Sequence, residues 1–282
     1  MKIQGTTLAV FVMVFGSMPP VEAVELRIGV RSDSAPFASL RSLDTTGQPW
    51  VGLASFEGFS VDICRRIADR AETSGWFKGV RAVPVDASDR LARIARRDVD
   101  FLCDPTSITV DRLSTCDFSF PYFVTGISYA TLGRSATKLV SLADSSIGYV
   151  KNTTALPRLR AEWKGRFGKY PKEFGYQTYE LAYHALVVRE IDAMFGDRDM
   201  LEKLLEEPLD EPISLASEPI SIETYAFCVE PSQHEVLRVV NETLAALYRS
   251  GEIFELIQKH FDGRRPSSVL YQLYGIFAAP DR

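Results

Sequence analysis

The stretch from Val99 to Val124, VDFLCDPTSITVDRLSTCDFSFPYFV, constrains the fold of this chain more than any other. Its first residues, Val99 to Cys103, are apolar enough to form a short buried strand. A polar turn follows, in which Ser107 or Thr109 can accept a hydrogen bond from backbone N–H groups, as helix-capping residues do. An aromatic segment, Phe118 to Phe123, then leads back to the sheet. The pattern predicts a turn at the carboxyl end of a strand, where open α/β sheets bind their ligands.

Arg112 stands one helical turn beyond that loop. Its planar guanidinium can hold a carboxylate through two parallel hydrogen bonds. The spacing equally allows an ordinary surface arginine on a helix, so spacing alone leaves both interpretations open.

Strands and helices alternate around this turn. The apolar pattern predicts strands at Leu26–Val30 and Val80–Val85. It predicts one helix at Ser60–Ala71 and a shorter one capped by Ser88. The order strand, helix, strand, helix predicts a parallel sheet with right-handed crossovers.

From about Leu132 the pattern restarts as a second, smaller α/β unit. Its predicted elements are strands at Ser146–Val150 and Ala193–Gly196 and helices at Thr154–Trp163, broken early by Pro157, Tyr179–Val188 and Met200–Glu206. The chain then returns through a strand at Thr224–Val229 and a long amphipathic helix that stops at Gly251. A shorter helix and a docked C-terminal helix are expected after it.

Residues 1–23 have the features of a secretory signal peptide. Lys2 gives a positive start, Leu8 to Phe15 is apolar, and Val21-Glu22-Ala23 suits cleavage. The apolar run is shorter than the ~20 residues of a membrane span. We therefore expect an exported, soluble mature protein, with an uncleaved anchor as the alternative.

Length and charge narrow the function classes. A chain of 282 residues exceeds one typical domain, so two lobes are expected. The 32 basic and 37 acidic residues form no basic block, which argues against nucleic acid or an anionic membrane as partner.

The cysteines are Cys64, Cys103, Cys116 and Cys228, and they show no CxxC spacing and no neighbouring histidine. A zinc site is therefore not expected. Export permits disulfides. Cys103 and Cys116 end and begin segments that approach each other, so they are a candidate pair, with small buried thiols as the alternative.

Five motifs, in order, resemble those of the family 3 extracellular solute-binding proteins, the periplasmic amino-acid receptors of ABC importers. The opening stretch resembles the core motif of that family. The other four are GFSVDICRRIADR from Gly58, DRLARIARRDVDFL from Asp89, IGYVKNTT from Ile147 and IDAMFGD from Ile191. The resemblance covers nearly the whole mature chain.

The resemblance implies an α/β, two-lobed periplasmic-binding-protein fold of type II. Each lobe would hold a mostly parallel sheet flanked by helices, and two strands would form the hinge. Lobe 1 is expected at residues 24–131 and 224–282, and lobe 2 at residues 132–223.

The resemblance also implies roles in binding an amino acid. Arg112 and Ser107 would hold the carboxylate, together with the backbone N–H groups of Thr153 and Thr154. Asp197 would hold the ammonium, although the same residue could instead cap the helix that follows it.

The chain departs from the family pattern before and within these motifs. Asp104 and Pro105 stand where the family has glycine and a small residue. Pro105 lacks a backbone donor but keeps its carbonyl as an acceptor. Asp104 adds negative charge, which could strengthen ammonium binding or admit a more cationic ligand. Asn152 replaces a glycine and tolerates the left-handed backbone conformation.

In the glutamate/aspartate branch of the family, arginines at the positions of Arg31 and Arg90 hold a distal carboxylate. An acidic ligand is therefore expected, unless Arg31 pairs with Asp33 and Arg90 with Asp86. A further alternative is that Arg31 points outward and Asp104 neutralises Arg90, which would leave a pocket for neutral or basic ligands. The apolar walls and a hydroxyl of the pocket would come from Phe37, Phe56 and Tyr179.

The expected function is a monomeric periplasmic receptor that binds a polar, possibly acidic, amino acid and delivers it to the membrane permease of an ABC transporter. No cofactor, metal or catalytic residue is expected. One alternative is an enzyme on the same scaffold, resembling cyclohexadienyl dehydratases, with Asp104, Asp197 or Glu57 as acid or base. The other is a ligand-sensing module acting through a second protein.

Overall fold

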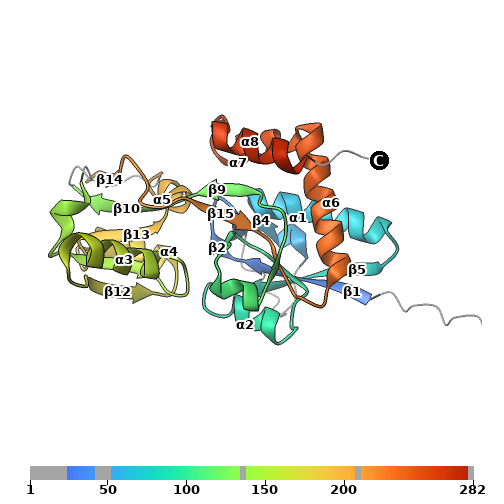
Figure 1. Cartoon of the computed structure of the whole chain (residues 1–282), viewed down its shortest axis with the longest axis horizontal. Coiled ribbons are helices and arrows are strands. Elements are labelled where there is room, and N and C mark those ends of the chain that lie inside the picture. The colour runs from blue at the N-terminus through green and yellow to red at the C-terminus, as the bar shows by residue number, and fades with distance from the viewer. Residues whose placement is uncertain (1–23, 42–51, 134–137, 207–210, 279–282) are drawn as a thin grey trace, which may run out of the picture.

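The computed structural model describes residues 24–41, 52–133, 138–206 and 211–278. The expected signal peptide at residues 1–23 lies outside the described residues. Among the helices of the described part, none has the length and apolar character that a membrane span requires. Figure 1 shows two α/β lobes side by side, connected by extended strands.

The first lobe is built on a five-stranded sheet in the order β5-β1-β6-β16-β8. The strands are β1 (Val24–Arg31), β5 (Phe77–Val85), β6 (Phe101–Cys103), β8 (Asp117–Phe118) and β16 (Cys228–Val229). β1 pairs in parallel with β5 and β6, whereas β16 runs antiparallel to its neighbours. The predicted parallel order of the first three strands is thus confirmed.

Helices cover this sheet. They are α1 (Phe59–Thr73), α2 (Arg90–Ala95), α6 (His234–Ser250), α7 (Glu252–His260) and α8 (Ser268–Phe277). Gly251 ends α6 with a left-handed φ of 80°, as predicted. A short 3-10 turn, η1 (Leu53–Ser55), and a small sheet of β2 (Asp33–Ser34), β3 (Ala38–Leu40) and β4 (Phe56–Glu57) complete the lobe.

The second lobe contains another five-stranded sheet, in the order β12-β11-β13-β10-β14. Its strands are β10 (Ile127–Leu132), β11 (Ser146–Val150), β12 (Lys172–Tyr176), β13 (Ala193–Asp197) and β14 (Ile213–Leu215). Its helices are α3 (Ala155–Phe167), α4 (Tyr179–Val187) and α5 (Arg198–Leu204), with a 3-10 turn, η3 (Leu139–Leu142). Part of its core forms a cluster of its own around Trp163 and Phe195, whereas other second-lobe residues, such as Tyr183 and Met194, belong to the main hydrophobic cluster that also contains first-lobe residues.

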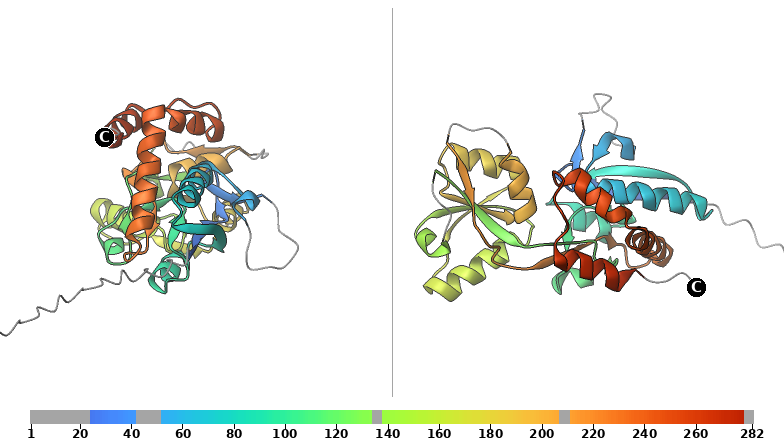
Figure 2. Two further views of the ribbon diagram at one scale, coloured as in Figure 1. Left: turned by 90° about the vertical axis from the view of Figure 1, so that its right-hand side faces the viewer. Right: turned by 90° about the horizontal axis from the view of Figure 1, so that it is seen from above.

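Two adjacent strands connect the lobes, as Figure 2 shows from above. β9 (Phe123–Thr125) leads out and β15 (Glu223–Ala226) leads back, and they pair with each other in antiparallel fashion. β15 also pairs with β7 (Thr106–Ser107). Gly126 is required here, because a Cβ at that position would lie 1.9 Å from the carbonyl oxygen of Ser221.

The sheet membership of β10 bears on the expected lobe boundaries. β10 already belongs to the second sheet, whereas residues up to 131 were expected in lobe 1. The boundaries remain a prediction, and the sheet order favours moving the first one back to Gly126.

Two details of the helix starts differ from prediction. α2 begins after Asp89 and not after Ser88, because the Ser88 hydroxyl and amide both donate to Asp86. Pro157 does not break α3. It lies in the first helical turn, where a backbone N–H has no intrahelical partner to lose.

The pairing of the cysteines corrects the prediction. Cys64 bonds to Cys103, which joins α1 to β6, and Cys116 bonds to Cys228. The expected pair of Cys103 with Cys116 is therefore wrong, and so is the alternative of free thiols. The reason is sheet order: β16 lies between β6 and β8, so the segment that contains Cys116 reaches Cys228 first.

Candidate ligand-binding site

The candidate site is a small cavity between the two lobes. Most of the residues predicted to bind ligand line it. They are Arg31, Arg90, Pro105, Ser107 and Arg112 from the first lobe, with Thr153, Thr154, Asp197 and also Met200 from the second. The cavity measures about 10 Å³, room for about one water molecule. An amino acid is larger than this cavity, so the cavity must widen to admit one.

A wider opening of about 600 Å³ adjoins this cavity and shares Arg112, Thr153 and Thr154 with it. Its remaining walls come from α2, the segment around Asp111 and the start of α3. It forms the mouth of the cleft.

Arg112 comes from η2 (Asp111–Ser114), a 3-10 turn that follows β7. Thr109 accepts a hydrogen bond from the Arg112 amide at 3.3 Å, as the predicted capping requires. The guanidinium donates to the Ser107 carbonyl at 2.8 Å, and no carboxylate of the described residues forms an ion pair with it. Burial lowers the pKa of Arg112, although Asp104 and Asp197 act in the opposite sense. It is a partly buried cation that can accept an anion.

Asp197 ends β13 and occupies the residue before α5. Its carboxylate makes no capping hydrogen bond, so capping does not explain its position. Both carboxylate oxygens instead accept tyrosine hydroxyls: Tyr179 donates at 2.7 Å, and Tyr225 donates to the other oxygen. Burial, reinforced by Glu223, raises the pKa of Asp197. A cation beside Asp197 would therefore stabilise its charged form.

The start of α3 supplies backbone donors to the same cavity. Asn152 has a φ of 60°, the left-handed conformation that was predicted for it. The Thr153 hydroxyl donates to the Val150 carbonyl at 2.8 Å, and the Thr154 hydroxyl donates to Glu223 at 2.7 Å. These bonds hold both side chains in place. The first N–H groups of a helix have no intrahelical partner and are suited to an anion.

Arg31 and Arg90 lie at the deep end of the cavity, and each has a carboxylate partner. Arg31 Nε lies 2.8 Å from Asp33, and Arg90 Nε lies 2.8 Å from Asp104. The alternative pairing of Arg31 with Asp33 is therefore present, whereas Arg90 pairs with Asp104 in place of Asp86. Arg31 does not point outward, because its side chain is buried and lines the cavity. Burial lowers the pKa of Arg90 to about 10, with Arg31 and Arg112 adding to the effect. Burial alone would lower the pKa of Arg31, but the nearby Asp33 outweighs that effect, and the pKa is raised.

Other predicted residues lie away from the cavity wall. Asp104 is fully buried behind Arg90 and accepts the Thr106 hydroxyl. Phe56 and Phe37 are fully buried in the hydrophobic core, where Phe37 packs edge-on against Phe123. Tyr179 acts through Asp197 as described above.

Sequence reasoning missed Met200 and Tyr225. Met200 is three residues beyond Asp197 on α5, so helical spacing could have suggested it. Tyr225 lies on a hinge strand opposite Ser107. Only the pairing of strands distant in sequence places it at Asp197.

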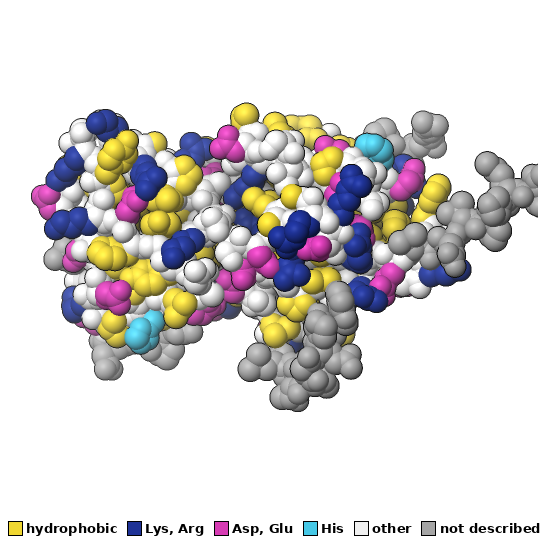
Figure 3. Space-filling model, turned by 90° about the horizontal axis from the view of Figure 1, so that it is seen from below, with side chains coloured by type: hydrophobic (Ala, Val, Ile, Leu, Met, Phe, Trp, Pro, Cys, Tyr) yellow, Lys and Arg dark blue, Asp and Glu magenta, His cyan; other side chains and the backbone are white. Residues whose placement is uncertain are grey.

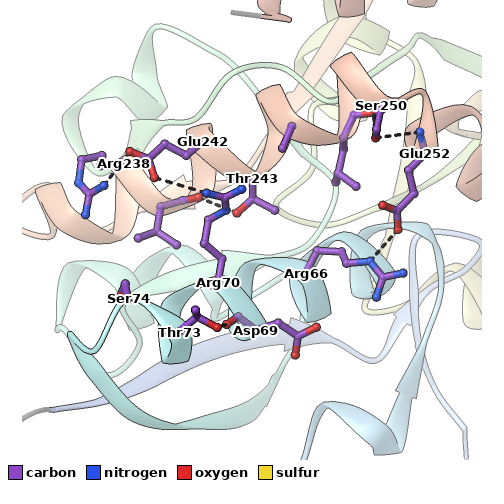
Figure 4. A pocket seen from close by; sticks show the side chains of 13 residues that line it. Arg66, Asp69, Arg70, Thr73, Ser74, Arg238, Glu242, Thr243, Ser250 and Glu252 are labelled. Atoms are coloured by element: carbon purple, nitrogen blue, oxygen red, sulfur yellow. Dashed lines mark hydrogen bonds and ion pairs between the residues drawn. The ribbon is translucent and has the colours of Figure 1, made fainter. Parts of the chain in front are cut away.

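A larger cavity of about 690 Å³ lies between α1 and α6, away from the cleft (Figure 4). Its charged groups pair with one another, as in Arg66 with Glu252 and Arg238 with Glu242, each at 2.7 Å. Acidic and basic side chains are mixed on the face in Figure 3. No cluster of metal-ligating side chains occurs within the described segments. We therefore place the candidate site in the cleft between the lobes.

Two α/β lobes, a two-strand hinge and a polar cavity between the lobes define a two-lobed binding protein of the periplasmic type. Residues 26–263 match the model of the bacterial extracellular solute-binding proteins, family 3, and the chain belongs to that family.

Curated relatives are distant but similar over most of their length. The glutamine-binding protein GlnH of an ABC transporter from Bacillus subtilis (strain 168) is 25% identical over 209 residues, covering 72% of each chain. The L-cystine-binding protein TcyJ from Escherichia coli (strain K12) is 23% identical over 208 residues, 72% of this chain and 74% of its own.

Solved structures show the same fold. The arginine-, lysine-, histidine-binding protein ArtJ from Geobacillus stearothermophilus superposes with a TM-score of 0.72 at 21% identity, covering 88% of this chain and 99% of its own. An ancestral amino acid-binding protein, a precursor of cyclohexadienyl dehydratase, superposes with a TM-score of 0.68 at 20% identity, covering 84% of this chain and 95% of its own.

Proposed function

We propose that this protein is the amino-acid receptor of an ABC importer. A single observation carries the proposal: the cleft brings Arg112, which forms no ion pair with any carboxylate of the described residues, to the same small cavity as the carboxylate of Asp197. An α-amino acid presents the complementary carboxylate and ammonium on one carbon atom.

Each ligand group finds partners from both lobes. Arg112 from lobe 1 and the start of α3 from lobe 2 would share the carboxylate, and Asp197 would take the ammonium. Closing the lobes removes water from these charge-assisted hydrogen bonds and strengthens them. An amino acid would therefore favour the closed state over the open one.

Membership in the family and the two disulfides agree with an exported protein in an oxidising compartment. We infer a monomer in the periplasm that passes its ligand to a membrane permease. The expected acidic ligand finds less support, because each deep arginine already has its own carboxylate.

The enzyme alternative drew on Asp104, Asp197 and Glu57. Asp104 is neutralised by Arg90, and Glu57 pairs with Arg41 outside the cavity at 3.2 Å. Asp197 accepts two tyrosine hydroxyls, which orient it for holding a cation. We propose binding in preference to turnover, and an assay for dehydratase turnover should give no product.

The proposal is tested by a thermal-shift screen of the exported protein against the twenty amino acids and their deaminated analogues. A ligand present at 100 times its Kd should add about 2.7 kcal/mol to the free energy of unfolding. We expect at least one amino acid to raise Tm and its deaminated analogue to do so far less. A screen in which no amino acid raises Tm would refute the proposal.

A further inference from the structure

The deep end of the cleft contains two guanidiniums and two carboxylates arranged in layers. Arg31 and Arg90 line the cavity, whereas neither Asp33 nor Asp104 belongs to its wall. Both arginines are almost fully buried, with 1% and 2% of the side chain exposed. The side chain of Asp33 is 10% exposed and that of Asp104 is fully buried, and each carboxylate lies 2.8 Å from Nε of its arginine. A ligand side chain would thus meet guanidinium first, with carboxylate behind it.

The charges of these four groups balance. Each arginine has one carboxylate of its own, so the deep end is neutral without any contribution from a ligand. The other charged pair of the cavity, Arg112 and Asp197, is balanced in turn by the carboxylate and ammonium that every α-amino acid carries. No net charge is left for a ligand side chain to neutralise.

A hydrogen-bond donor nevertheless remains at the deep end. Nη2 of Arg31 is buried and has no hydrogen-bond partner among the described residues. Nε of Arg90 lies 2.8 Å from Oδ2 of Asp104 without forming a hydrogen bond, and Oδ2 of Asp33 also lacks a partner among the described residues, so the donor available to a ligand is Nη2 of Arg31. A buried donor without an acceptor is unfavourable, so an acceptor on the ligand would be stabilised there.

We propose that the deep end of the cleft selects a ligand with an uncharged side chain that carries a hydrogen-bond acceptor, a carboxamide above all. This inference rests on the proposed amino-acid site. Asp33 and Asp104 are then specificity-determining residues. They replace the negative charge that a ligand carboxylate would otherwise bring to Arg31 and Arg90.

The other ligand classes fit less well. A side-chain carboxylate would accept from the same donors but would leave one negative charge buried without compensation. A basic side chain would present its positive charge to two guanidiniums at close range. A carboxamide oxygen accepts from the guanidiniums and adds no charge. Met200 supplies an apolar surface on the same wall for the methylene groups of the ligand.

Isothermal titration of the whole exported protein with glutamine, asparagine, glutamate, aspartate, arginine and lysine tests this assignment. We expect wild type to bind an amide at least tenfold more tightly than the acid of the same length and than either basic amino acid. Tighter binding of an acidic or a basic amino acid would overturn the inference while the proposed function stands. The absence of binding by all amino acids would instead refute the proposed function, and the inference with it.

Asp104→Asn removes the internal charge while keeping an acceptor for the Thr106 hydroxyl. In this variant we expect the ratio of amide to acid affinity to fall at least tenfold. Asp100→Asn is the matched control, since Asp100 is equally buried and paired with Arg27 at 2.6 Å, but outside the cleft. Its amide-to-acid ratio should equal that of wild type.

Asp33→Asn is a second variant, which removes the negative charge beside Arg31. Circular dichroism establishes which variants are folded. The inference is overturned if the folded variants at positions 33 and 104 keep the wild-type ratio, or if the Asp100 control shifts it equally. Should neither variant fold, the ranking of ligands by wild type decides alone.

Discussion

At the scale of single residues, the cleft is defined by which charges have partners. Arg31 and Arg90 are each paired with a carboxylate, whereas Arg112 donates, within the part of the chain that the structure describes, only to the Ser107 backbone carbonyl. Asp197 is held by tyrosine hydroxyls, which orient its charge without cancelling it. The residues that are expected to hold the charged carboxylate and ammonium of the ligand are thus those that the fold leaves unneutralised.

Arg112→Ala should abolish amino-acid binding and leave the apoprotein folded. The ligand carboxylate would lose its partner in a closed site, at a cost of about 3–5 kcal/mol. Because burial already disfavours the Arg112 charge, its removal should not lower the free energy of unfolding of the apoprotein. Titration calorimetry and urea unfolding measure the two effects, with the exposed Arg96→Ala as control. Unchanged affinity in a folded Arg112→Ala protein would contradict the assignment.

Asp197→Asn should weaken amino acids far more than the corresponding deaminated carboxylates. The amide keeps the shape and one acceptor oxygen for a tyrosine hydroxyl, but it lacks the charge that meets the ammonium. Parallel titrations with an amino acid and its deaminated analogue give the comparison. Equal losses for the two ligands would show that Asp197 does not bind the ammonium.

At the scale of elements, α5 lies at the junction of the two lobes. Its Asp199 accepts the hydroxyl of Thr125 on β9 at 2.8 Å. Arg264, from the segment after α7, bridges Asp199 at 3.0 Å and also pairs with Glu202. α5 is therefore tied both to the hinge and to the C-terminal part of the first lobe.

The stability of this junction should depend on pH. Burial raises the pKa of Asp199 to about 6 from 3.8, with Glu202 and Asp197 adding to the shift and Thr125 and Arg264 opposing it. Below pH 4 the carboxyl is protonated in both the folded and the unfolded chain. Between pH 4 and 6 only the folded chain holds the proton, so rising pH lowers the free energy of unfolding, by up to about 3 kcal/mol.

Asp199→Asn should remove that contribution. Relative to wild type, the variant should gain stability between pH 4 and pH 7, measured by denaturant unfolding at each pH. The Asp98→Asn variant on the surface serves as control. A difference between Asp199→Asn and wild type that stays constant over this range would show that Asp199 does not titrate there.

At the scale of the whole molecule, both disulfides belong to the first lobe. They close loops of different length, with sequence separations of 39 for Cys64–Cys103 and 112 for Cys116–Cys228. In the chain-entropy model the two bonds stabilise the fold by about 4 and about 5 kcal/mol. The second lobe contains no cysteine, but the loop that the Cys116–Cys228 bond closes encloses it.

The double replacement Cys116→Ser/Cys228→Ser should therefore lower the free energy of unfolding by about 1 kcal/mol more than Cys64→Ser/Cys103→Ser. Denaturant unfolding of both variants provides the measurement, and thiol titration of unfolded wild type verifies that its cysteines are paired. Two free thiols or more in wild type would contradict the pairing.

Local residue patterns were sufficient for much of the fold. Apolar periodicity located β1, β11 and α6 to within a few residues, because burial of one face imposes that periodicity on the sequence. Gly251, which lacks a Cβ, and Asn152 both have the left-handed backbone conformation that these residue types tolerate, since such preferences are local.

Contacts between distant segments were decided only by the tertiary structure. The sequence offered the neutralisation of Arg90 by Asp104 only as one alternative and gave no sign that Tyr225 reaches Asp197 across the hinge, because the partners belong to different elements. The cysteine pairs were unpredictable for the same reason: the strand order, with β16 between β6 and β8, determines which thiols meet. A side chain's type is written in the sequence, but whether its charge is free to bind a ligand depends on the neighbours that folding brings to it.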